Sequence, residues 1–181
     1  MKKAILRDIQ RDDLEKVLIW RNQDFIRSVM FNNSQISYEQ HIAWYNQLQQ
    51  SNKRICKIFS VEDKDYGVLN ITNMNVESNS CEWGFYIGEK NSSKGTGLFL
   101  GYTSLNYIFS TLKIRKVCAE VLESNIISRN FHKKLGFQLD GILRKHLLRN
   151  NRYEDVYLYS IFQNEWLLNE EKIRKELEER F

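Results

Sequence analysis

Residues 125–137, which follow a strongly apolar segment, form the stretch that decides the fold. They read Asn-Ile-Ile-Ser-Arg-Asn-Phe-His-Lys-Lys-Leu-Gly-Phe. Before them, Val117, Ala119 and Val121 alternate with other residues, which predicts a buried strand over 116–122. A helix is predicted from residue 125 onward, and Gly136 ends it, because glycine accepts the left-handed conformation that closes many helices. Strand-then-helix order in this half of the chain, after strand-rich segments in the first half, predicts a mixed sheet.

A second informative stretch, residues 88–97, reads Gly-Glu-Lys-Asn-Ser-Ser-Lys-Gly-Thr-Gly and joins a predicted strand to a predicted helix. A loop that enters a helix through glycines exposes backbone N–H groups where the helix dipole is positive, and such a site suits a pyrophosphate. Lys94 adds a positive charge. Gly95 and Gly97 can equally serve only to let the chain turn. The stretch lacks the GxxxxGK[ST] pattern, and Leu100 occupies the place of the third glycine of GxGxxG.

Together the two stretches resemble the acyl-CoA-binding motifs of the GNAT superfamily of N-acetyltransferases. The family's first motif is (Arg/Gln)-x-x-Gly-x-(Gly/Ala); residues 92–97 match its glycines, but Ser92 replaces the leading Arg or Gln. The second motif is Asn-x-x-(Ala/Ser)-x-x-(Phe/Leu)-Tyr-x-x-x-Gly-Phe, and His132 stands where the family usually has Tyr. The positions that match the second motif are Asn125, Ser128, Phe131, Gly136 and Phe137.

The resemblance implies an α+β GNAT fold, with a central mixed, mostly antiparallel, twisted sheet of about seven strands flanked by helices and followed by a C-terminal helix. The residue patterns agree with it. They predict strands over 4–9, 54–61, 66–74, 80–87, 116–122, 137–148 and 153–161. They predict helices over 14–24, from 38, from 97, over 125–135 and over 164–181. No linker or repeat interrupts the chain, so a single N-acetyltransferase domain over 1–181 is expected.

A narrower resemblance lies in the first half of the chain. Its helices look like the acceptor-side helices of enzymes that acetylate UDP-linked 4-amino sugars in pseudaminic acid biosynthesis, and part of the pattern is shared with acetyltransferases of ribosomal protein N-termini. This resemblance implies substrate-binding roles for Arg21, Asn22, Arg27, Met30, His41 and Trp44. The structural alternatives are a solvated face for the arginines and core packing for the histidine and the tryptophan.

The GNAT resemblance also implies acetyl-CoA as co-substrate, lying between two parallel strands, 80–87 and 116–122, that splay apart. Backbone N–H groups near Tyr86 and Ile87 would then meet the thioester oxygen, and Asn125 would bind the pantetheine. The other cofactor-binding residues that it implies are Lys94, Gly95, Thr96, Gly97, Leu98, Ser128, Arg129 and Lys133. No metal is expected.

Acetyl transfer to an amine needs a base for the amine proton and an acid for the leaving thiolate. An imidazole can protonate a thiolate whose thiol has a pKa of about 8.5, so His132 is the candidate acid. Alternatively, His132 is an ordinary helix residue and water is the acid. Glu82 is the candidate base if Trp83 faces the other side of the sheet, with Glu120 and Glu123 as rivals. Each of these carboxylates can also be a plain surface residue.

Composition restricts the partners. The 181 residues carry a net charge of +4 without a basic stripe, which argues against nucleic acid. No apolar window approaches the length of a membrane span. Three separated cysteines without a CxxC pair indicate free thiols in a reducing cytosol, so a cytoplasmic location is expected. The chain has no proline, which excludes collagen-like and polyproline structures.

The sequence therefore predicts an acetyl-CoA-dependent N-acetyltransferase that acts on a small-molecule amine by direct attack in a ternary complex. The first candidate acceptor is a UDP-linked amino sugar of the 4-amino-4,6-dideoxy-N-acetyl-altrosamine type. A protein N-terminus or a polyamine is the alternative, although a polyamine site should be strongly acidic and the first two helices are not. An alternative of another class is a non-catalytic CoA-binding module. A homodimer is compatible with the sequence.

Overall fold

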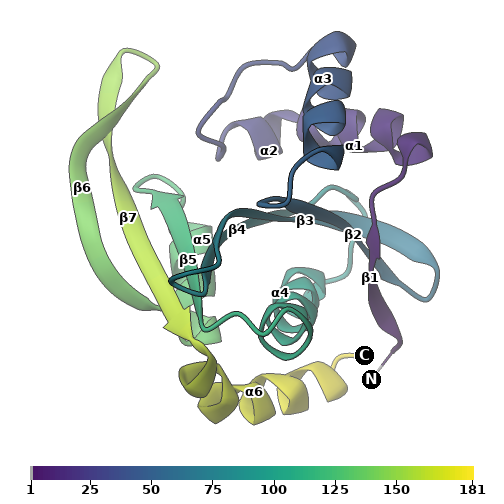
Figure 1. Ribbon diagram of the computed structural model, residues 1–181, viewed down its shortest axis with the longest axis vertical. Helices are drawn as coiled ribbons and strands as arrows, with labels where there is room; N and C mark the ends of the chain where they lie inside the picture. The colour runs from purple at the N-terminus through teal and green to yellow at the C-terminus, as the bar shows by residue number, and fades with distance from the viewer. Residues whose placement is uncertain (1) are drawn as a thin grey trace.

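The computed structural model describes residues 2–181, which form a seven-stranded sheet with helices on both faces (Figure 1). The strand order is β1-β2-β3-β4-β5-β7-β6, and every neighbouring pair is antiparallel except β4 and β5. The strands are β1 (Ala4–Asp8), β2 (Ile55–Val61), β3 (Lys64–Asn75), β4 (Ser80–Ile87), β5 (Lys116–Leu122), β6 (Gln138–Arg149) and β7 (Arg152–Phe162). The predicted α+β architecture with a mixed, mostly antiparallel sheet is confirmed.

Six α-helices and two short irregular helices complete the part of the chain that the structure describes. The α-helices are α1 (Leu14–Arg21), α2 (Asp24–Arg27), α3 (Tyr38–Gln49), α4 (Thr96–Asn106), α5 (Ile126–Leu135) and α6 (Gln163–Glu178). A 3₁₀ turn, η1 (Arg11–Asp13), precedes α1, and a π-helical turn, η2 (Tyr107–Thr111), extends α4. The predicted C-terminal helix is therefore present as α6.

Local sequence signals explain where α3 and α5 begin and end. Ser37 caps α3: its Oγ accepts the Gln40 amide at 3.3 Å, and Gln40 Oε1 accepts the Ser37 amide at 2.9 Å. Gly136, with φ of 97°, ends α5 as predicted. The single helix predicted over 14–24 is wrong, because α1 stops at Arg21 and α2 follows as a separate turn. At the break, the Asn22 amide group makes two hydrogen bonds with the Ile36 backbone, at 2.8 and 2.9 Å.

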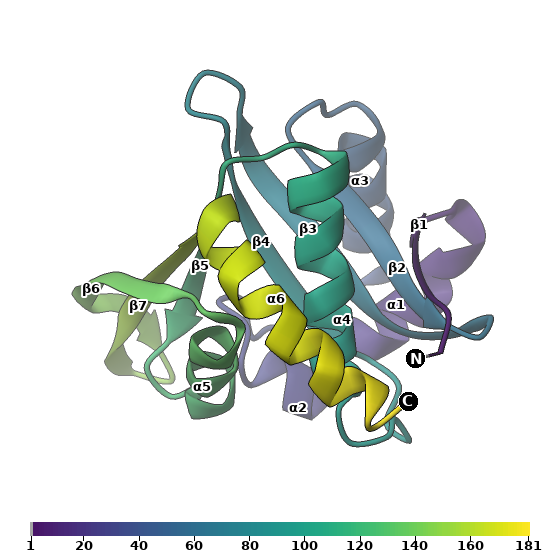
Figure 2. The ribbon, with the colours of Figure 1, turned by 90° about the horizontal axis from the view of Figure 1, so that it is seen from below.

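The two faces of the sheet carry separate cores. Helices α1 and α3 cover one face, where the buried apolar side chains include Leu14, Val17, Trp20, Leu48, Ile58 and Val68. Helices α4 and α6 cover the other face, as Figure 2 shows, and the larger core there includes Phe59, Trp83, Phe99, Leu105, Val117 and Trp166. In the central strands, the alternation of side chains therefore directs successive residues to one helical layer and then the other.

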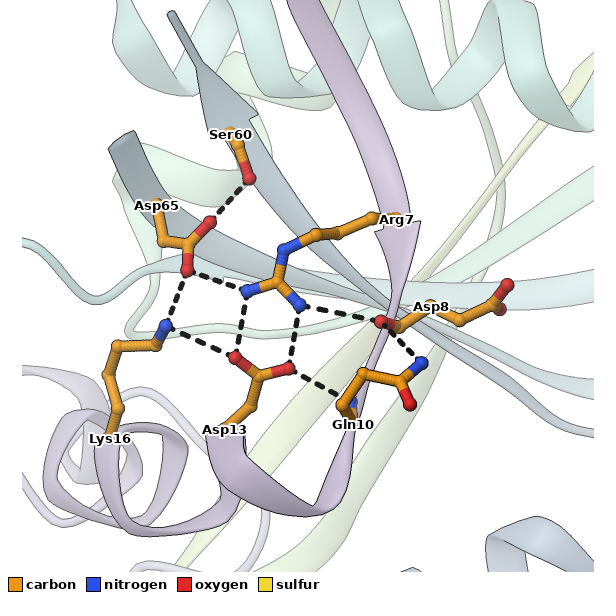
Figure 3. Close-up of polar contacts among 7 residues, drawn as sticks. All are labelled: Arg7, Asp8, Gln10, Asp13, Lys16, Ser60 and Asp65. Carbon is orange, nitrogen blue, oxygen red and sulfur yellow. Dashed lines mark hydrogen bonds and ion pairs between the residues drawn. The ribbon is translucent and has the colours of Figure 1, made fainter. Parts of the chain in front are cut away.

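A polar network at the start of the chain fixes β1 and α1 to strands β2 and β3 (Figure 3). Arg7 donates to both carboxylate oxygens of Asp13, each at 2.7 Å, and to Asp65 at 2.6 Å. Lys16 forms ion pairs with the same two carboxylates, and Ser60 donates to Asp65. Because every charge in the network has an opposite charge in contact, the network can be partly buried without leaving an isolated ion.

Candidate active site

The centre of the sheet opens between β4 and β5. These parallel strands pair at only three positions, Ser80 with Lys116, Cys81 with Val117 and Glu82 with Cys118. Beyond Glu82, β4 remains paired with β3 up to Ile87 on its other edge, and β5 remains paired with β7 up to Leu122. The two strands therefore splay apart, as the family resemblance implies, and leave one backbone edge of β4 open.

The register of β4 decides which of its amides face that opening. The Gly88 amide donates to the Tyr66 carbonyl of β3 at 2.8 Å. Successive residues of a strand direct their N–H groups to opposite edges, so the Tyr86 amide also faces β3. The amides of Phe85 and Ile87 then face the gap. Of the two amides predicted to meet a thioester oxygen, the one of Ile87 is placed for that role, and Phe85 is an additional donor that sequence reasoning missed.

A cavity of about 700 Å³ lies at this opening, on the face covered by α1 and α3. Its walls come from α1, the loop over 28–36, α3, β3, β4, β5 and the start of α5. Most of the lining is apolar. The polar and charged lining side chains are Arg21, Asn32, Gln40, His41, Asn70, Thr72, Glu82, Tyr86, Glu120, Asn125, Ser128 and His132. A drug-sized molecule fits a cavity of this size.

Two carboxylates approach each other in this cavity. Trp83 packs in the core on the α4 side, so Glu82 faces the cavity, as the sequence predicted. Asn73 Nδ2 donates to Glu82 Oε2 at 2.9 Å. Burial, reinforced by the charge of Glu82, raises the pKa of Glu120 above its ordinary value. A carboxylate with a raised pKa accepts a proton more readily, which makes Glu120 the stronger candidate base.

His132 is buried and both ring nitrogens are engaged. Its Nδ1 lies 2.7 Å from the Ser128 carbonyl, which can only accept, so Nδ1 carries the proton. Its Nε2 accepts the Trp83 indole N–H at 3.2 Å. Burial lowers the pKa of His132 to about 4. In this arrangement the ring is neutral at pH 7 and presents no free N–H to a leaving thiolate, so a role as general acid would require the ring to change partners.

A cationic and aromatic group lines another part of the cavity. Arg21 Nη2 donates to the Asn32 carbonyl at 2.7 Å, whereas Nη1 is buried and has no hydrogen-bond partner among residues 2–181. Burial lowers the pKa of Arg21. His41 stacks on Trp44 with ring centroids 5.0 Å apart, and its Nε2 is likewise buried without a partner within the described chain. Met30 also lines the cavity, so four of the six predicted substrate-binding residues meet there.

The other two predicted substrate-binding residues lie elsewhere. Asn22 holds the backbone of Ile36 and does not line the cavity, so it positions the loop over 28–36. Arg27 lines a second cavity beside α2. Arg129, which the resemblance placed at the outer phosphates of CoA, also lines the second cavity and lies over the Tyr157 ring at 3.8 Å.

The glycine loop has the local structure of an anion cradle. Gly95 caps α4 with φ of 103°, a conformation that costs little only for glycine. The amide of Thr96 donates to the Ser93 carbonyl at 3.1 Å, but the amides of Gly97 and Leu98 have no acceptor within residues 2–181. Two unused amides at the positive end of a helix suit a pyrophosphate. Lys94 is exposed beside them.

The start of α5 faces the first cavity. Asn125 Oδ1 accepts the Ser128 amide at 3.1 Å, which leaves the Asn125 side-chain NH₂ group available to a ligand, and both residues line the cavity. Lys133 is exposed on the same helix. Sequence reasoning missed Asn70 and Thr72 of β3, which line the cavity beside Val68. Polar residues at every second position of a strand were the signal that could have found them.

Comparisons with known proteins identify relatives of this chain. Residues 6–158 match the family model described as an acetyltransferase (GNAT) domain. A spermidine N(1)-acetyltransferase of Vibrio cholerae is 27% identical over 165 residues, which span 90% of this chain and 94% of that enzyme. A ribosomal protein uS5-alanine N-acetyltransferase of Escherichia coli is 26% identical over 111 residues, 60% of this chain and 57% of that enzyme.

A solved structure shares the fold. The spermidine N-acetyltransferase from Vibrio cholerae in complex with CoA and spermine superposes with a TM-score of 0.84 over 91% of this chain and 98% of that chain, at 24% identity. None of these relatives is named for an amino sugar, so they do not support the narrower resemblance to pseudaminic acid enzymes. Within residues 2–181, no helix has the length and apolarity to cross a membrane, and no cluster of three His, Cys, Asp or Glu residues could hold a metal ion.

Proposed function

This chain belongs to the GNAT family of acetyltransferases and transfers the acetyl group of acetyl-CoA to an amine, and we propose that its acceptor is a small molecule that carries both a primary amine and an anionic group. The observation that carries the proposal is Arg21, a half-buried residue that lines the cavity and whose Nη1 is buried without a partner among residues 2–181. A buried cation is costly unless an opposite charge compensates it. An anionic group on the acceptor would supply that charge.

The two ends of such an acceptor have separate partners in the cavity. Glu82 and Tyr86 lie four residues apart on β4, which corresponds to about 13 Å along an extended strand. Glu120 lies close enough to Glu82 for its pKa to respond, and Tyr86 is close enough to Arg21 to influence the pKa of that arginine. A nucleotide-activated amino sugar could therefore place its amine at the carboxylates and its diphosphate at the arginine. Trp44 and Tyr86 offer aromatic surface to the rest of the molecule.

A polyamine is the second candidate, and a specific observation favours it. The Vibrio cholerae relatives described above are named for spermidine, so on the comparisons alone a polyamine is the better-supported acceptor. Glu82 and Glu120 could bind one of its ammonium groups. A second ammonium group near Arg21, however, would meet a like charge in a desolvated cavity.

The reaction requires a neutral amine beside the thioester. In the proposed step, Glu120 takes the ammonium proton, directly or through water, and the amine nitrogen then bonds to the acetyl carbonyl carbon. The Phe85 amide, which the strand register places nearer to Glu120 than the Ile87 amide, holds the oxygen of the tetrahedral intermediate. The carbon–sulfur bond breaks and CoA leaves as a thiolate that takes up a proton. Because His132 has both nitrogens engaged, we assign it the positioning of Trp83 and α5, and water is the proton donor.

Thiol release from acetyl-CoA tests the acceptor, with UDP-4-amino sugar, spermidine and a peptide with N-terminal alanine assayed in parallel. We expect turnover with the amino sugar, and Arg21→Gln should raise its KM about tenfold through loss of a charge-assisted contact. Arg11→Gln is the matched control, since Arg11 is exposed and does not line the cavity. Turnover with spermidine alone, unchanged or improved in Arg21→Gln, would replace the proposal with the polyamine. Turnover with the peptide alone would refute both.

A further inference from the structure

We propose that a second cavity, separated from the acceptor cavity by the loop over 28–36, binds a phosphate-type oxyanion. This cavity has a volume of about 830 Å³ and lies between α2, the start of α5 and the β6–β7 hairpin. Figure 1 shows the hairpin curving up on the side of the sheet where α2 lies. The proposal goes beyond acetyl transfer, because none of the charged residues that line this cavity also lines the acceptor cavity.

Four arginines line the second cavity and are called the arginine cluster: Arg27, Arg129, Arg149 and Arg152. They come from α2, α5 and the two strands of the hairpin, so residues far apart in sequence meet at one place. Three members, Arg27, Arg129 and Arg149, have a buried Nε that finds no acceptor within residues 2–181. The planar guanidinium matches the geometry of a phosphate oxyanion, which makes such a cluster selective for that ligand class.

The carboxylates of the cavity do not neutralise the cluster. They are Asp24, Glu123 and Glu154. Asp24 and Glu154 are already bound by one arginine each, at 2.5 and 3.1 Å. The remaining arginines, Arg129 and Arg152, form no ion pair in the part of the chain that the structure describes, and only Glu123 is available to offset them. The cavity therefore retains an excess of positive charge. A bound anion would compensate this charge and lower the electrostatic free energy of the cavity.

The hairpin closes this cavity through contacts with the first half of the chain. Arg149 Nη2 donates to the Ser28 carbonyl at 2.8 Å. Asn33 Nδ2 makes a longer contact with Asn150 Oδ1, at 3.4 Å. The loop over 28–36 is thus held to the hairpin at two points, and an anion bound by arginines from both sides would strengthen the connection.

The same loop forms a wall of the acceptor cavity. The carbonyls of two successive residues, Asn32 and Asn33, are contacted by arginines from opposite cavities: Arg21 at 2.7 Å and Arg27 at 3.5 Å. An anion that orders Arg27 on one side therefore also restrains the residues that line the acceptor cavity on the other side. The structure links the two cavities through this loop.

Calorimetric titration with inorganic pyrophosphate tests the site, using protein already saturated with CoA so that the cofactor's phosphate site is occupied. We expect binding, weakened about tenfold in Arg152→Gln, which removes one guanidinium contact from an exposed position. Arg144→Gln is the matched control, because Arg144 is an exposed arginine of the same hairpin outside the cavity. Absence of binding, equal loss in both variants, or displacement of CoA by pyrophosphate would each overturn the proposal.

Hydrogen exchange tests the connection to the loop without any acceptor. Pyrophosphate should slow amide exchange within residues 28–36 in the wild-type protein and have less effect in Arg152→Gln, and unchanged exchange in the wild type would refute the coupling. A parallel titration with UDP identifies the source of the anion. If Arg21→Gln also weakens UDP binding, the bound anion is the phosphate group of the acceptor itself. If only Arg152→Gln weakens UDP binding, the site binds an anion separate from the acceptor.

Discussion

Replacement of His132 by Phe tests how much the buried His132 ring, which joins α5 to Trp83 of β4, stabilises the fold. Phe keeps most of the ring volume but removes both nitrogens, so the Trp83 indole N–H loses its acceptor and the Ser128 carbonyl loses one of its two donors. Leaving a buried polar group unsatisfied costs about 1–3 kcal/mol. We therefore expect His132→Phe to lower the free energy of unfolding by about 3 kcal/mol at pH 7.5. With an ordinary urea dependence, the midpoint of unfolding falls by about 1.5 M.

The size of this loss should depend on pH in a defined direction. Burial lowers the pKa of His132 from 6.5 in the unfolded chain to about 4 in the folded protein. Between these values the unfolded state binds a proton that the folded state does not, so protons favour unfolding. The stabilisation is fully present above pH 6.5 and is lost as the pH falls toward 4. Since each tenfold change in proton affinity is worth about 1.4 kcal/mol, the loss amounts to about 3 kcal/mol.

The assay is urea unfolding of the wild type and His132→Phe, followed by tryptophan fluorescence between pH 7.5 and 4.5. Other titrating groups, such as His41 with its lowered pKa, are present in both proteins and cancel in the difference. We expect the difference between the two proteins to shrink steadily below pH 6.5. His146→Phe, at an exposed position, should show no such trend. A difference between wild type and His132→Phe that is constant with pH would refute the assignment of His132 as a buried neutral ring.

Three further predictions concern other parts of the molecule. Glu120→Gln should lower kcat and remove the acidic limb of the pH–rate profile, because the pKa of Glu120 is raised and this group is the proposed base. Glu82→Gln should only shift that limb. Identical pH–rate profiles for the two variants would contradict this assignment. Gly95→Ala should destabilise the loop by about 1 kcal/mol and raise the KM for acetyl-CoA, since φ is 103°, while Gly141→Ala, where a Cβ meets nothing within 4 Å, should change neither. Asp13→Asn should lower the free energy of unfolding by about 2 kcal/mol at pH 7 by weakening the charge-assisted hydrogen bonds that the buried Asp13 carboxylate accepts from Arg7, which keeps Asp65 as its other partner, and thermal unfolding measures this. The pKa of Asp13 is lowered in the folded protein, so wild-type stability from this pair is present at neutral pH and is lost only as the pH falls below about 4.

Features of the fold that depend on neighbouring residues were predictable from the sequence. Ser37 and Gln40 form their predicted capping box, and Gly136 ends α5 in the left-handed conformation, because both signals act within one turn of the helix. Alternation along β4 correctly placed Glu82 in the cavity and Trp83 in the opposite core. The role of glycine in the loop before α4 was also predictable, since Gly95 adopts a backbone conformation that other residues avoid.

Features that depend on distant partners were not predictable. The sequence places Arg129 and Lys133 on one helix, but the direction of Arg129 is set by Tyr157 of β7, which lies below its guanidinium. The state of His132 is set by Trp83, a residue 49 positions away. The break at Asn22 arises from its pair of hydrogen bonds with Ile36. In each case the deciding contact forms only after the sheet has brought separate segments together.

The acceptor illustrates the same limit most clearly. The resemblance named Arg21 as a substrate-binding residue, and Glu120 was a rival candidate base, but sequence alone left each with the alternative of a plain surface residue. The structure shows that Arg21 and Glu120 line the same, largely apolar cavity. Charges of opposite sign at separated points of one cavity select against molecules that carry a single kind of charge, because one end would meet a like charge. Relatives at 27% identity or below can retain the fold and the acetyl donor while differing in these few side chains, so the charge pattern of the cavity, more than overall similarity, should decide the acceptor.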